Sequence, residues 1–313
     1  MFKKISISIS TYLCFSLTQA SIAQFASQGL IDSLKKVVIP TNTNGWSITG
    51  TTNFTFSQVG LSNWTAGGKN SVSIISLGIY RANYANNNIS WNNYLELGYG
   101  LTKIGNDQFR KSDDRIIFVS QAGIAAGKTM NHSLLIDFRT QFTEGKNYSS
   151  GIDTLTGDYP ITSRFLSPGY LTTGLGIEFK PEKYVSILLS PITGRLTFIA
   201  DKDISEKGLF NVKKGEHIRA NAGSLLHANF NNEVLDNVLI ASRLNVFSPF
   251  DSPWRMIINC ENMITLKVNS FIKVTLSADA FYDDRIIIQR DDGSLGPATQ
   301  LKNTFGVGFG YTF

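Results

Sequence analysis

Large apolar side chains occupy every second position in many stretches of this chain. In the segment TFGVGFGYTF, which spans 304–313, one face carries five of them, and Gly and Thr residues alternate with these five: Phe305, Val307, Phe309, Tyr311 and Phe313. A period of two is the geometry of a β-strand, because successive side chains point to opposite faces of a sheet. The pattern predicts a strand with one strongly apolar face.

Stretches of this kind recur along most of the sequence. Twelve strands are predicted, at 46–57, 71–85, 88–103, 115–127, 131–144, 167–180, 185–199, 217–230, 237–247, 254–268, 270–282 and 301–313. A tilted strand needs about 9–11 residues to cross a bilayer. Each predicted strand is long enough to span a membrane.

The links between these strands alternate in length without exception. Short links rich in Gly, Asn, Pro and charge fall near 86–88, 127–131, 180–183, 231–236 and 269–270, and longer links fall at 58–70, 104–114, 145–166, 200–216, 248–253 and 283–300. Transmembrane barrels have this rhythm because their periplasmic turns are short and their external loops are long. A soluble sandwich has no reason to keep it.

The two faces of the predicted strands differ in polarity. In 271–282, Val274 and Leu276 oppose Lys273 and Asp279, and in 132–142 the apolar face opposes Arg139 in the same way. Closing such a sheet in lipid turns the apolar face outward and pairs every backbone group. The predicted fold class is therefore all-β: a transmembrane antiparallel up-and-down β-barrel of about 12 strands, with both ends on the periplasmic side. Alternation is poor in 71–85, and a bulge is predicted at Ser190-Pro191.

Composition supports an exported β-protein. The 313 residues are 42% hydrophobic and only 17% charged, with 27 Gly, 21 Phe and 11 Tyr. The N-terminal stretch MFKKISISISTYLCFSLTQASIAQ has two lysines, a short apolar region and small residues before Gln24, which is typical of a secretory signal. Removing it takes away Lys3 and Lys4, so the net charge falls from +5 to +3, too weak to indicate a nucleic-acid partner.

These features predict the organisation and location of the chain. We expect a signal peptide at 1–23, a short periplasmic segment at 24–45 and an outer-membrane β-barrel at 46–313. After cleavage only Cys260 is left, so no intramolecular disulfide is expected. The predicted location is a bacterial cell outer membrane. The apolar alternation at 305–313 also resembles the signal that outer-membrane assembly machinery reads.

Several segments resemble a family of uncharacterised outer-membrane β-barrels from the Bacteroidota lineage, DUF3078-like, a domain of unknown function. The segments are FSQVGLSNWTAGGKNS at 56–71, WNNYLELGYGL at 91–101, FRKSDDR at 109–115, SPGYLTTGLGIEFKP at 167–181, LSPITGRLTFIAD at 189–201, FYDD at 281–284 and the closing FGVGFGYTF. The resemblance implies a barrel fold and an outer-membrane location. It implies no activity, because the family has no established one.

Charged residues on the inward faces are the candidate lining of a pore. They are Glu96, Asp137, Arg139, Glu178, Arg195, Arg219, Arg243, Arg255, Glu261, Lys267, Lys273 and Asp279. A wide channel selective for one sign of charge would carry a ring of that sign. The mixed signs favour either ion pairs that cross-link a narrow lumen or a small hydrophilic pore with weak anion preference.

A second candidate site lies at the loop-side strand ends. It consists of Trp64, Asp113, Asp114, Asp201, Asp203, Asp283 and Asp284. Trp64 lies beside Gly67 and Gly68 and would be either a sugar-stacking or partner-binding platform or an anchor of the barrel rim. Carboxylate oxygens suit hard cations, so a cation or lipopolysaccharide-bridging site is one interpretation. The other is solvated loop charge and local ion pairs, because basic residues are interspersed and no spacing matches a calcium loop.

The sequence offers little for catalysis. An outer-membrane phospholipase would need His, Ser and Asn together, and Asn131, His132 and Ser133 are adjacent, so neighbouring side chains point to opposite faces. His227 and Asn229 share a face without an obvious nucleophile. We predict no enzyme, no cofactor and no metal, with a lipid-modifying enzyme as a weak alternative.

The predicted function is a narrow pore or binding protein for small hydrophilic solutes. The alternative is a non-conducting barrel with a structural or assembly role. Expected partners are outer-membrane lipid and lipopolysaccharide, the outer-membrane assembly machinery, and a periplasmic or outer-membrane protein.

Overall fold

A computed structural model describes the chain at residues 44–62, 69–148, 151–152, 157–182, 184–268, 272–290, 294–309 and 311–312. The expected signal peptide, almost all of the expected periplasmic segment, Trp64 and Phe313 lie outside these residues. Both features at the start of the chain therefore stay predictions.

The described chain is almost entirely β-structure. Its long strands are β1 (Gly45–Val59), β2 (Ser71–Asn86), β3 (Ile89–Ile104), β4 (Arg110–Ala125), β5 (Met130–Thr140), β8 (Gly169–Glu182), β9 (Val185–Phe198), β10 (Ile218–Leu235), β11 (Val238–Pro249), β12 (Ile257–Lys267), β13 (Ile272–Asp283) and β16 (Gln300–Phe309). Short elements are β6 (Gly145–Lys146), β7 (Ile161–Ser163), β14 (Ile288–Gln289), β15 (Leu295–Gly296), β17 (Tyr311–Thr312) and the helix α2 (Lys202–Ser205).

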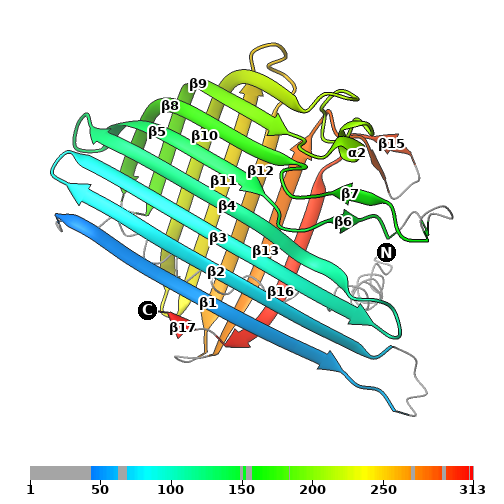
Figure 1. Cartoon of the computed structure of the whole chain (residues 1–313). Helices are drawn as coiled ribbons and strands as arrows, with labels where there is room; N and C mark the ends of the chain where they lie inside the picture. The colour runs from blue at the N-terminus through cyan, green and yellow to red at the C-terminus, as the bar shows by residue number, and fades with distance from the viewer. Residues whose placement is uncertain are drawn as a thin grey trace, which may run out of the picture.

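One antiparallel sheet contains all the long strands in the order of the chain (Figure 1). The order is β16-β13-β12-β11-β10-β9-β8-β5-β4-β3-β2-β1-β17, and β6–β7 and β14–β15 form separate small hairpins in the long loops. Each predicted strand corresponds to an observed one, so the predicted all-β antiparallel meander is confirmed.

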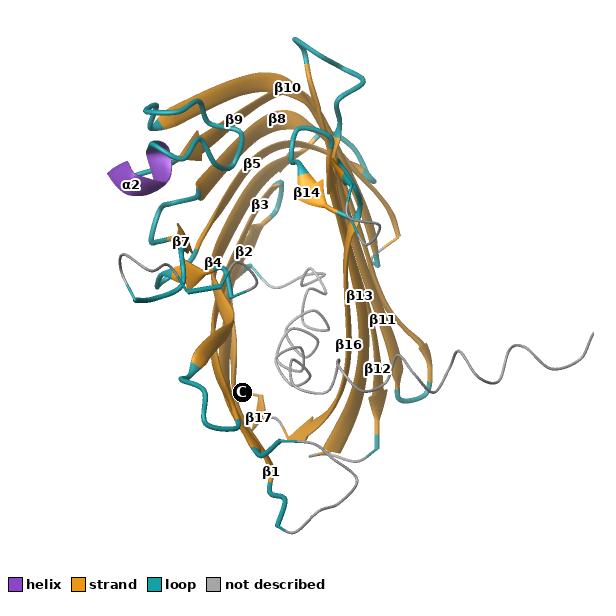
Figure 2. Cartoon of the chain, turned by 90° about the vertical axis from the view of Figure 1, so that its right-hand side faces the viewer, coloured by secondary structure: helices purple, strands orange, loops and turns teal. Residues whose placement is uncertain are grey.

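The sheet curls strongly, so that β2, β3 and β4 lie opposite β11, β12 and β13 (Figure 2). The two ends of the strand order, β16 and β17, follow one another in sequence, with only residue 310 between them. β17 pairs with β1 through Thr51↔Thr312 and Thr52↔Tyr311. Within the described residues the sheet is not joined into a closed cylinder, and closure with about 12 strands stays a prediction.

The alternation of short and long links is also observed. Short links join β2 to β3, β4 to β5, β8 to β9, β10 to β11 and β12 to β13, and long links fall at the other ends of the strands. Two of the tightest turns contain Asn87 and Asn237 with positive φ, a conformation that Asn tolerates better than most residues. Because the strands are antiparallel, all short turns lie at one end of the sheet, the turn side, and all long loops at the other, the loop side.

Two local differences from the sequence prediction matter for the site. β4 begins at Arg110 rather than at 115, so Asp113 and Asp114 lie in a strand and not in a loop. The run of charged residues there is typical of a loop, but in the structure these residues are part of β4 and their side chains form ion pairs on the sheet. β12 begins at Ile257, which leaves Arg255 in the preceding loop.

The predicted bulge is confirmed. Next to Pro191 the register of β9 shifts against both β8 and β10. The backbone is so close there that an added Cβ at Gly176 would overlap the carbonyl oxygen of Leu189. A proline in a central strand removes a ladder hydrogen bond, and the bulge accommodates that loss.

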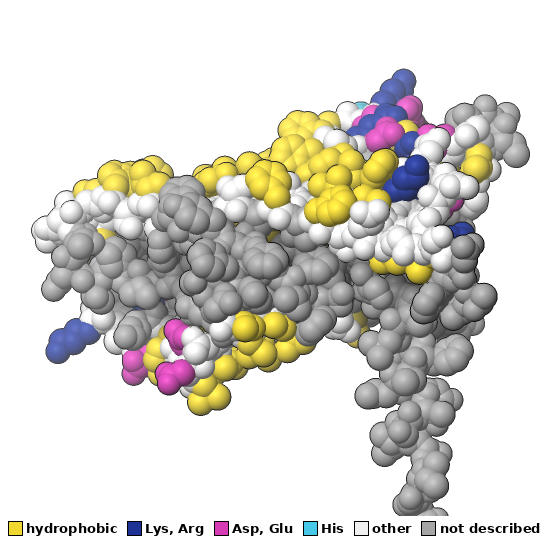
Figure 3. Space-filling model, turned by 90° about the horizontal axis from the view of Figure 1, so that it is seen from below, with side chains coloured by type: hydrophobic (Ala, Val, Ile, Leu, Met, Phe, Trp, Pro, Cys, Tyr) yellow, Lys and Arg dark blue, Asp and Glu magenta, His cyan; other side chains and the backbone are white. Residues whose placement is uncertain are grey.

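The convex face of the sheet carries exposed apolar side chains, among them Ile74, Leu134, Leu175, Leu189 and Ile264. Figure 3 shows hydrophobic side chains along the upper edge of the molecule and a further patch along the lower edge, with Lys, Arg, Asp and Glu gathered at the end where Figure 1 places α2. On this face at the turn side, the rings of Tyr84 and Trp91 lie 5.3 and 5.5 Å from that of Trp46. No helix among the described residues has the length and apolar character needed to cross a membrane.

Candidate functional site

Charged side chains from five strands meet on the concave face of the sheet. We call this group the interior ion network; it consists of Glu96 on β3, Asp113 and Arg115 on β4, Asp137 and Arg139 on β5, Arg243 on β11, and Glu261 on β12. Residues two apart in a strand share a face, as Asp113 and Arg115 do, and so do Asp137 and Arg139. Register partners on neighbouring strands also share a face, as Arg243 and Glu261 do.

One half of the network is centred on Arg115. Its guanidinium lies 2.9 Å from Glu96 and 3.1 Å from Asp113. The Tyr94 hydroxyl donates a hydrogen bond to the other carboxylate oxygen of Glu96. Glu96 is buried, and one hydrogen bond from Tyr94 and the ion pair with Arg115 offset the cost of burying its charge.

The other half is centred on Glu261. Arg139 holds Asp137 through two hydrogen bonds of 2.8 and 2.9 Å and reaches Glu261 at 3.6 Å. Arg243 reaches the same Glu261 at 3.2 Å, and Asn259 donates a further hydrogen bond to it at 3.0 Å. Glu261 therefore forms ion pairs with arginines from two different walls of the sheet.

These contacts cross the interior of the curled sheet. β8, β9, β10 and β11 separate β5 from β12 in the strand order, so a flat sheet would hold Arg139 and Glu261 roughly 24 Å apart at about 4.8 Å a strand. The guanidinium of Arg243 on β11 also lies 5.9 Å from the ring of Tyr94 on β3, across five intervening strands. Opposite walls thus touch through charged and aromatic side chains.

The bridge is only partly shielded from solvent. The side chain of Arg139 is 26% exposed and that of Glu261 is 28% exposed. Water or a small polar solute can reach such groups, whereas a wide channel would leave the opposite walls too far apart to pair.

Apolar side chains fill the space beside the network. Leu135, Leu188, Leu225, Phe247 and Ile257 form one buried cluster, and Leu77, Ile79 and Tyr94 form another. Both lie on the same face as the charges. Apolar side chains on the concave face explain why β2 alternates poorly in sequence: both faces of that strand carry apolar residues.

A buried histidine lies on the same face. The Nδ1 of His227 is hydrogen-bonded to the Oδ1 of Asn245, so Nδ1 is the donor, and Asn229 donates to Nε2 at 2.6 Å. Both ring nitrogens are occupied by amides. The geometry is that of a neutral, positioned imidazole and not that of a catalytic base.

The structure brings five of the predicted interior charges together: Glu96, Asp137, Arg139, Arg243 and Glu261. Sequence reasoning missed Arg81 on β2, Tyr94, and Arg115 as members of this face. The signals that could have found them are the register of Arg81 opposite Tyr94 and the period-two spacing of Asp113 and Arg115.

The other predicted interior charges lie apart from the network. Glu178 pairs with Lys180 at 2.8 Å near the turn side. Arg195 lies over the ring of Tyr170 at 5.2 Å, and Arg219 donates to the carbonyl oxygen of Asn211 at 2.7 Å.

Four further predicted interior charges lie on β12, on β13 or in the loop before β12. Arg255 pairs with Asp284 at 3.6 Å in the loops, so it does not line the interior. Lys267 and Lys273 are register partners on β12 and β13, and Asp279 is the register partner of Glu261.

The predicted loop aspartates do not form one site among the described residues. Asp114 accepts from Lys111 and from the amides of Phe142 and Thr143. Asp283 accepts from the amide of Arg285 at 3.0 Å. No group of three or more His, Cys, Asp or Glu side chains in the described part of the chain could hold a metal ion.

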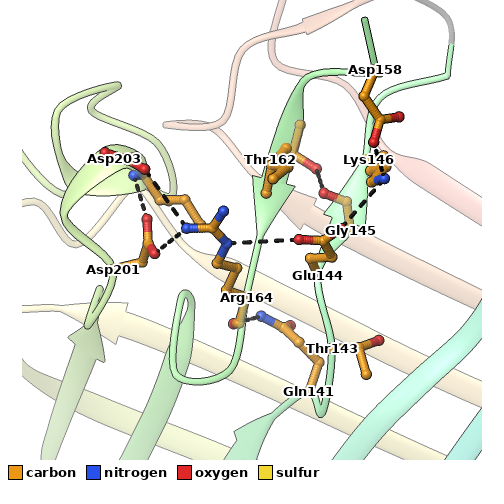
Figure 4. A network of polar contacts seen from close by, with 12 residues as sticks. Gln141, Thr143, Glu144, Gly145, Lys146, Asp158, Thr162, Arg164, Asp201 and Asp203 are labelled. Atoms are coloured by element: carbon orange, nitrogen blue, oxygen red, sulfur yellow. Dashed lines mark hydrogen bonds and ion pairs between the residues drawn. The ribbon is translucent and has the colours of Figure 1, made fainter. Parts of the chain in front are cut away.

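Asp201 and Asp203 belong to a second group of charges in the long loops, which we call the loop network (Figure 4). Arg164 lies 2.6 Å from Asp201, 3.7 Å from Asp203 and 3.9 Å from Glu144. The Asp201 side chain also caps α2 by accepting from the amide of Ile204. Burial opposes ionisation of Asp201, but the hydrogen bonds from Arg164 and Ile204 outweigh it, and the pKa of Asp201 is lowered.

The candidate catalytic residues are separated as expected. Ser133 donates to Glu178 at 3.3 Å, and Asn131 donates to the same carboxylate at 3.1 Å. His132 is on the opposite face of β5, because it lies between them in a strand. The hydroxyl of Ser133 is hydrogen-bonded to Glu178 and not to His132, so the two residues do not form a His–Ser pair.

Comparison with known proteins gives a matching family. Residues 56–146 match the family described as "Protein of unknown function (DUF3078)". This segment covers β2 to β6 and the end of β1 from Phe56 to Val59, and so includes Glu96, Asp113, Arg115, Asp137 and Arg139. No curated protein sequence matches the chain.

Solved structures with a similar arrangement are outer-membrane proteins. An outer membrane channel from Pseudomonas putida F1 has 8% identity and a TM-score of 0.39, with 88% of this chain and 98% of that chain covered. The translocator domain of the autotransporter NalP from Neisseria meningitidis has 11% identity and a TM-score of 0.35, with 94% and 100% covered. OmpT, an outer membrane protein of Vibrio cholerae, has 8% identity and a TM-score of 0.29, with 86% and 96% covered.

Proposed function

We propose that this chain is an outer-membrane β-barrel protein. The support is physical: the convex face exposes Ile74, Leu134, Leu175 and Ile264, while the concave face gathers charge. In water an open sheet would bury its apolar face, whereas lipid reverses the preference. The short turns would face the periplasm and the long loops the cell exterior.

The interior would bind small hydrophilic solutes in a narrow space and would not form a wide water-filled channel. The observation that carries this is the Arg139–Glu261 contact at 3.6 Å, which joins two walls across four intervening strands. Because both side chains stay partly exposed, the space beside the bridge is polar and solvated. Solutes passing there would meet guanidinium and carboxylate groups directly.

A non-conducting barrel with a structural or assembly role is the second candidate. It is favoured by the buried apolar cluster of Leu135, Leu188, Leu225, Phe247 and Ile257, which fills part of the same interior. Neither candidate assigns a reaction to the chain.

The proposed partners follow from this placement. Lipid would contact the convex face, and lipopolysaccharide the loop side, where Lys and Arg side chains gather (Figure 3). The assembly machinery would read the apolar alternation of β16 and β17, which contain Phe305, Val307, Phe309 and Tyr311.

Single-channel recording in planar bilayers separates the two candidates. The wild-type protein should give small conductance steps, and Glu261→Gln should increase them at least twofold by releasing Arg139 and Arg243. Asp203→Asn, at a loop side chain that is 81% exposed, is the matched control and should leave the steps unchanged. Silence of both wild type and Glu261→Gln at high protein load would exclude solute passage and leave the non-conducting barrel.

A further inference from the structure

Arg81 is a buried cation without a carboxylate partner. It lies on β2 on the concave face, is 6% exposed, and is the register partner of Tyr94 on β3. Its guanidinium lies 4.9 Å from the Tyr94 ring, and its Nε has no hydrogen-bond partner. Among the described residues, no carboxylate lies within ion-pair distance of it.

The neighbouring carboxylates are already engaged. Arg115 and Tyr94 hold Glu96, Arg139 holds Asp137, and Arg139 and Arg243 hold Glu261. None of these acids is left for Arg81. An unpaired guanidinium in a buried position is unfavourable, so the arrangement calls for a counter-charge.

A second arginine on this face is in a similar position. Arg195, like Arg81, lies over an aromatic ring and has no ion pair among the described residues.

A second guanidinium approaches Arg81 from the opposite wall. Arg243 on β11 lies 5.9 Å from the same Tyr94 ring, so the two guanidiniums share one aromatic platform. The planar fork of an arginine matches two oxygens of a carboxylate or phosphate group. Two such forks around one ring form a clamp for an oxyanion.

We propose that Arg81 and Arg243, both beside the Tyr94 ring, form a binding site for a small anion that carries a carboxylate or phosphate group. This inference rests on the proposed solute-binding interior and names the solute class. Tyr94 positions the clamp, because its hydroxyl is held by Glu96 and its ring contacts both guanidiniums. Neutral solutes of the same size would lack the groups that satisfy Arg81.

The test is calorimetric titration of the full-length protein in detergent, with inorganic phosphate, succinate and glucose as probes. We expect one site for phosphate, succinate or both, and none for glucose. Arg81→Gln should weaken binding at least tenfold, and Arg81→Lys, which keeps the charge without the fork, should fall between. Arg110→Gln, at a partly exposed arginine that begins β4 on the loop side and pairs with Asp107, is the matched control and should bind as wild type does.

Three results would overturn the site: no binding of either anion, unchanged binding by Arg81→Gln, or equal weakening by Arg110→Gln. Folding of each variant is checked by the heat-dependent shift of its band on an SDS gel. If Arg81→Gln does not fold, Arg81→Lys and the anion-dependent thermal midpoint of wild type decide the question. The assay needs no membrane, so a silent bilayer recording excludes passage and leaves the anion site standing. Glucose binding without anion binding would exclude the anion site and leave a solute-binding interior.

Discussion

Gly176 on β8 lies directly against the backbone of Leu189 on β9, at the bulge beside Pro191. A Cβ at position 176 would overlap the Leu189 carbonyl oxygen, and the atoms in the way are backbone atoms that cannot rotate aside. The close approach joins two strands beside Pro191, where the ladder loses a donor. Glycine is required here by contact and not by an unusual φ.

Gly176→Ala should therefore destabilise the fold by about 1–3 kcal/mol, the usual range for overpacking. The measurement is the temperature or urea midpoint of the heat-dependent band shift on SDS gels. Gly127→Ala is the control, since nothing lies within 4 Å of an added Cβ there. Equal midpoints for the two variants would show that the strands separate freely at the bulge.

Removing Glu261, the acid at the centre of the interior ion network, should lower the free energy of unfolding. Glu261→Gln leaves Arg139 and Arg243 facing each other with one carboxylate fewer, and breaking such a partly buried group costs about 3 kcal/mol. Urea unfolding in lipid vesicles, followed by tryptophan fluorescence, measures the loss.

The control for that loss is Asp203→Asn in the exposed part of the loop network, which should change stability by no more than about 0.5 kcal/mol. A loss at position 261 no larger than at 203 would show that the bridge across the interior contributes nothing to stability.

The cap of α2 should respond to acid. The folded pKa of Asp201 is lowered, so its contribution is complete above the unfolded value of about 3.9 and is lost as the pH falls through the lower folded value. Hydrogen exchange at 202–208, corrected for the intrinsic rate, should rise in that acidic range.

Asp201→Asn tests the cause of this acid response. Asn can still cap the helix, but it lacks the charge that Arg164 pairs with, so exchange should be raised already at neutral pH and should no longer depend on acid. A wild-type rate that is flat down to pH 3 would contradict the role of the ion pair.

Cysteine labelling in intact cells tests the orientation. In a Cys260→Ser background, Asp203→Cys on the loop side should react with a membrane-impermeant maleimide, and Asn88→Cys on the turn side should react only after the outer membrane is permeabilised. Both positions are exposed, so accessibility within the protein does not decide the result. The reverse pattern would invert the proposed topology.

The strands could be predicted from sequence because their signal is local. Period-two alternation and Asn-rich turns place every long strand, and the turn at Asn87 fits a residue that tolerates positive φ. The pattern fails in β2, where Leu77 and Ile79 are buried on the concave face beside charge, so polarity does not separate its two faces. Arg81 was missed for this reason.

The partners within the interior could not be predicted. Arg139 and Glu261 are distant in the chain and in the strand order, and only the curvature of the whole sheet brings them within 3.6 Å. The position of Arg115 was also hard to predict, because the acidic residues before it are typical of a loop. Its neighbours Glu96 and Asp113 come from the close pairing of β3 and β4.

The contact between opposite walls implies that dissolved salt acts unequally on different parts of the molecule. At an ionic strength of 0.15 M, mobile ions screen exposed charges beyond about 8 Å but penetrate poorly where protein excludes them. Lys213 and Glu216, whose side chains are 85% and 51% exposed in a long loop, are open to that screening. The side chains of Arg139 and Glu261 are 26% and 28% exposed between two walls of the sheet, so added salt should weaken their attraction less than that of the loop pair.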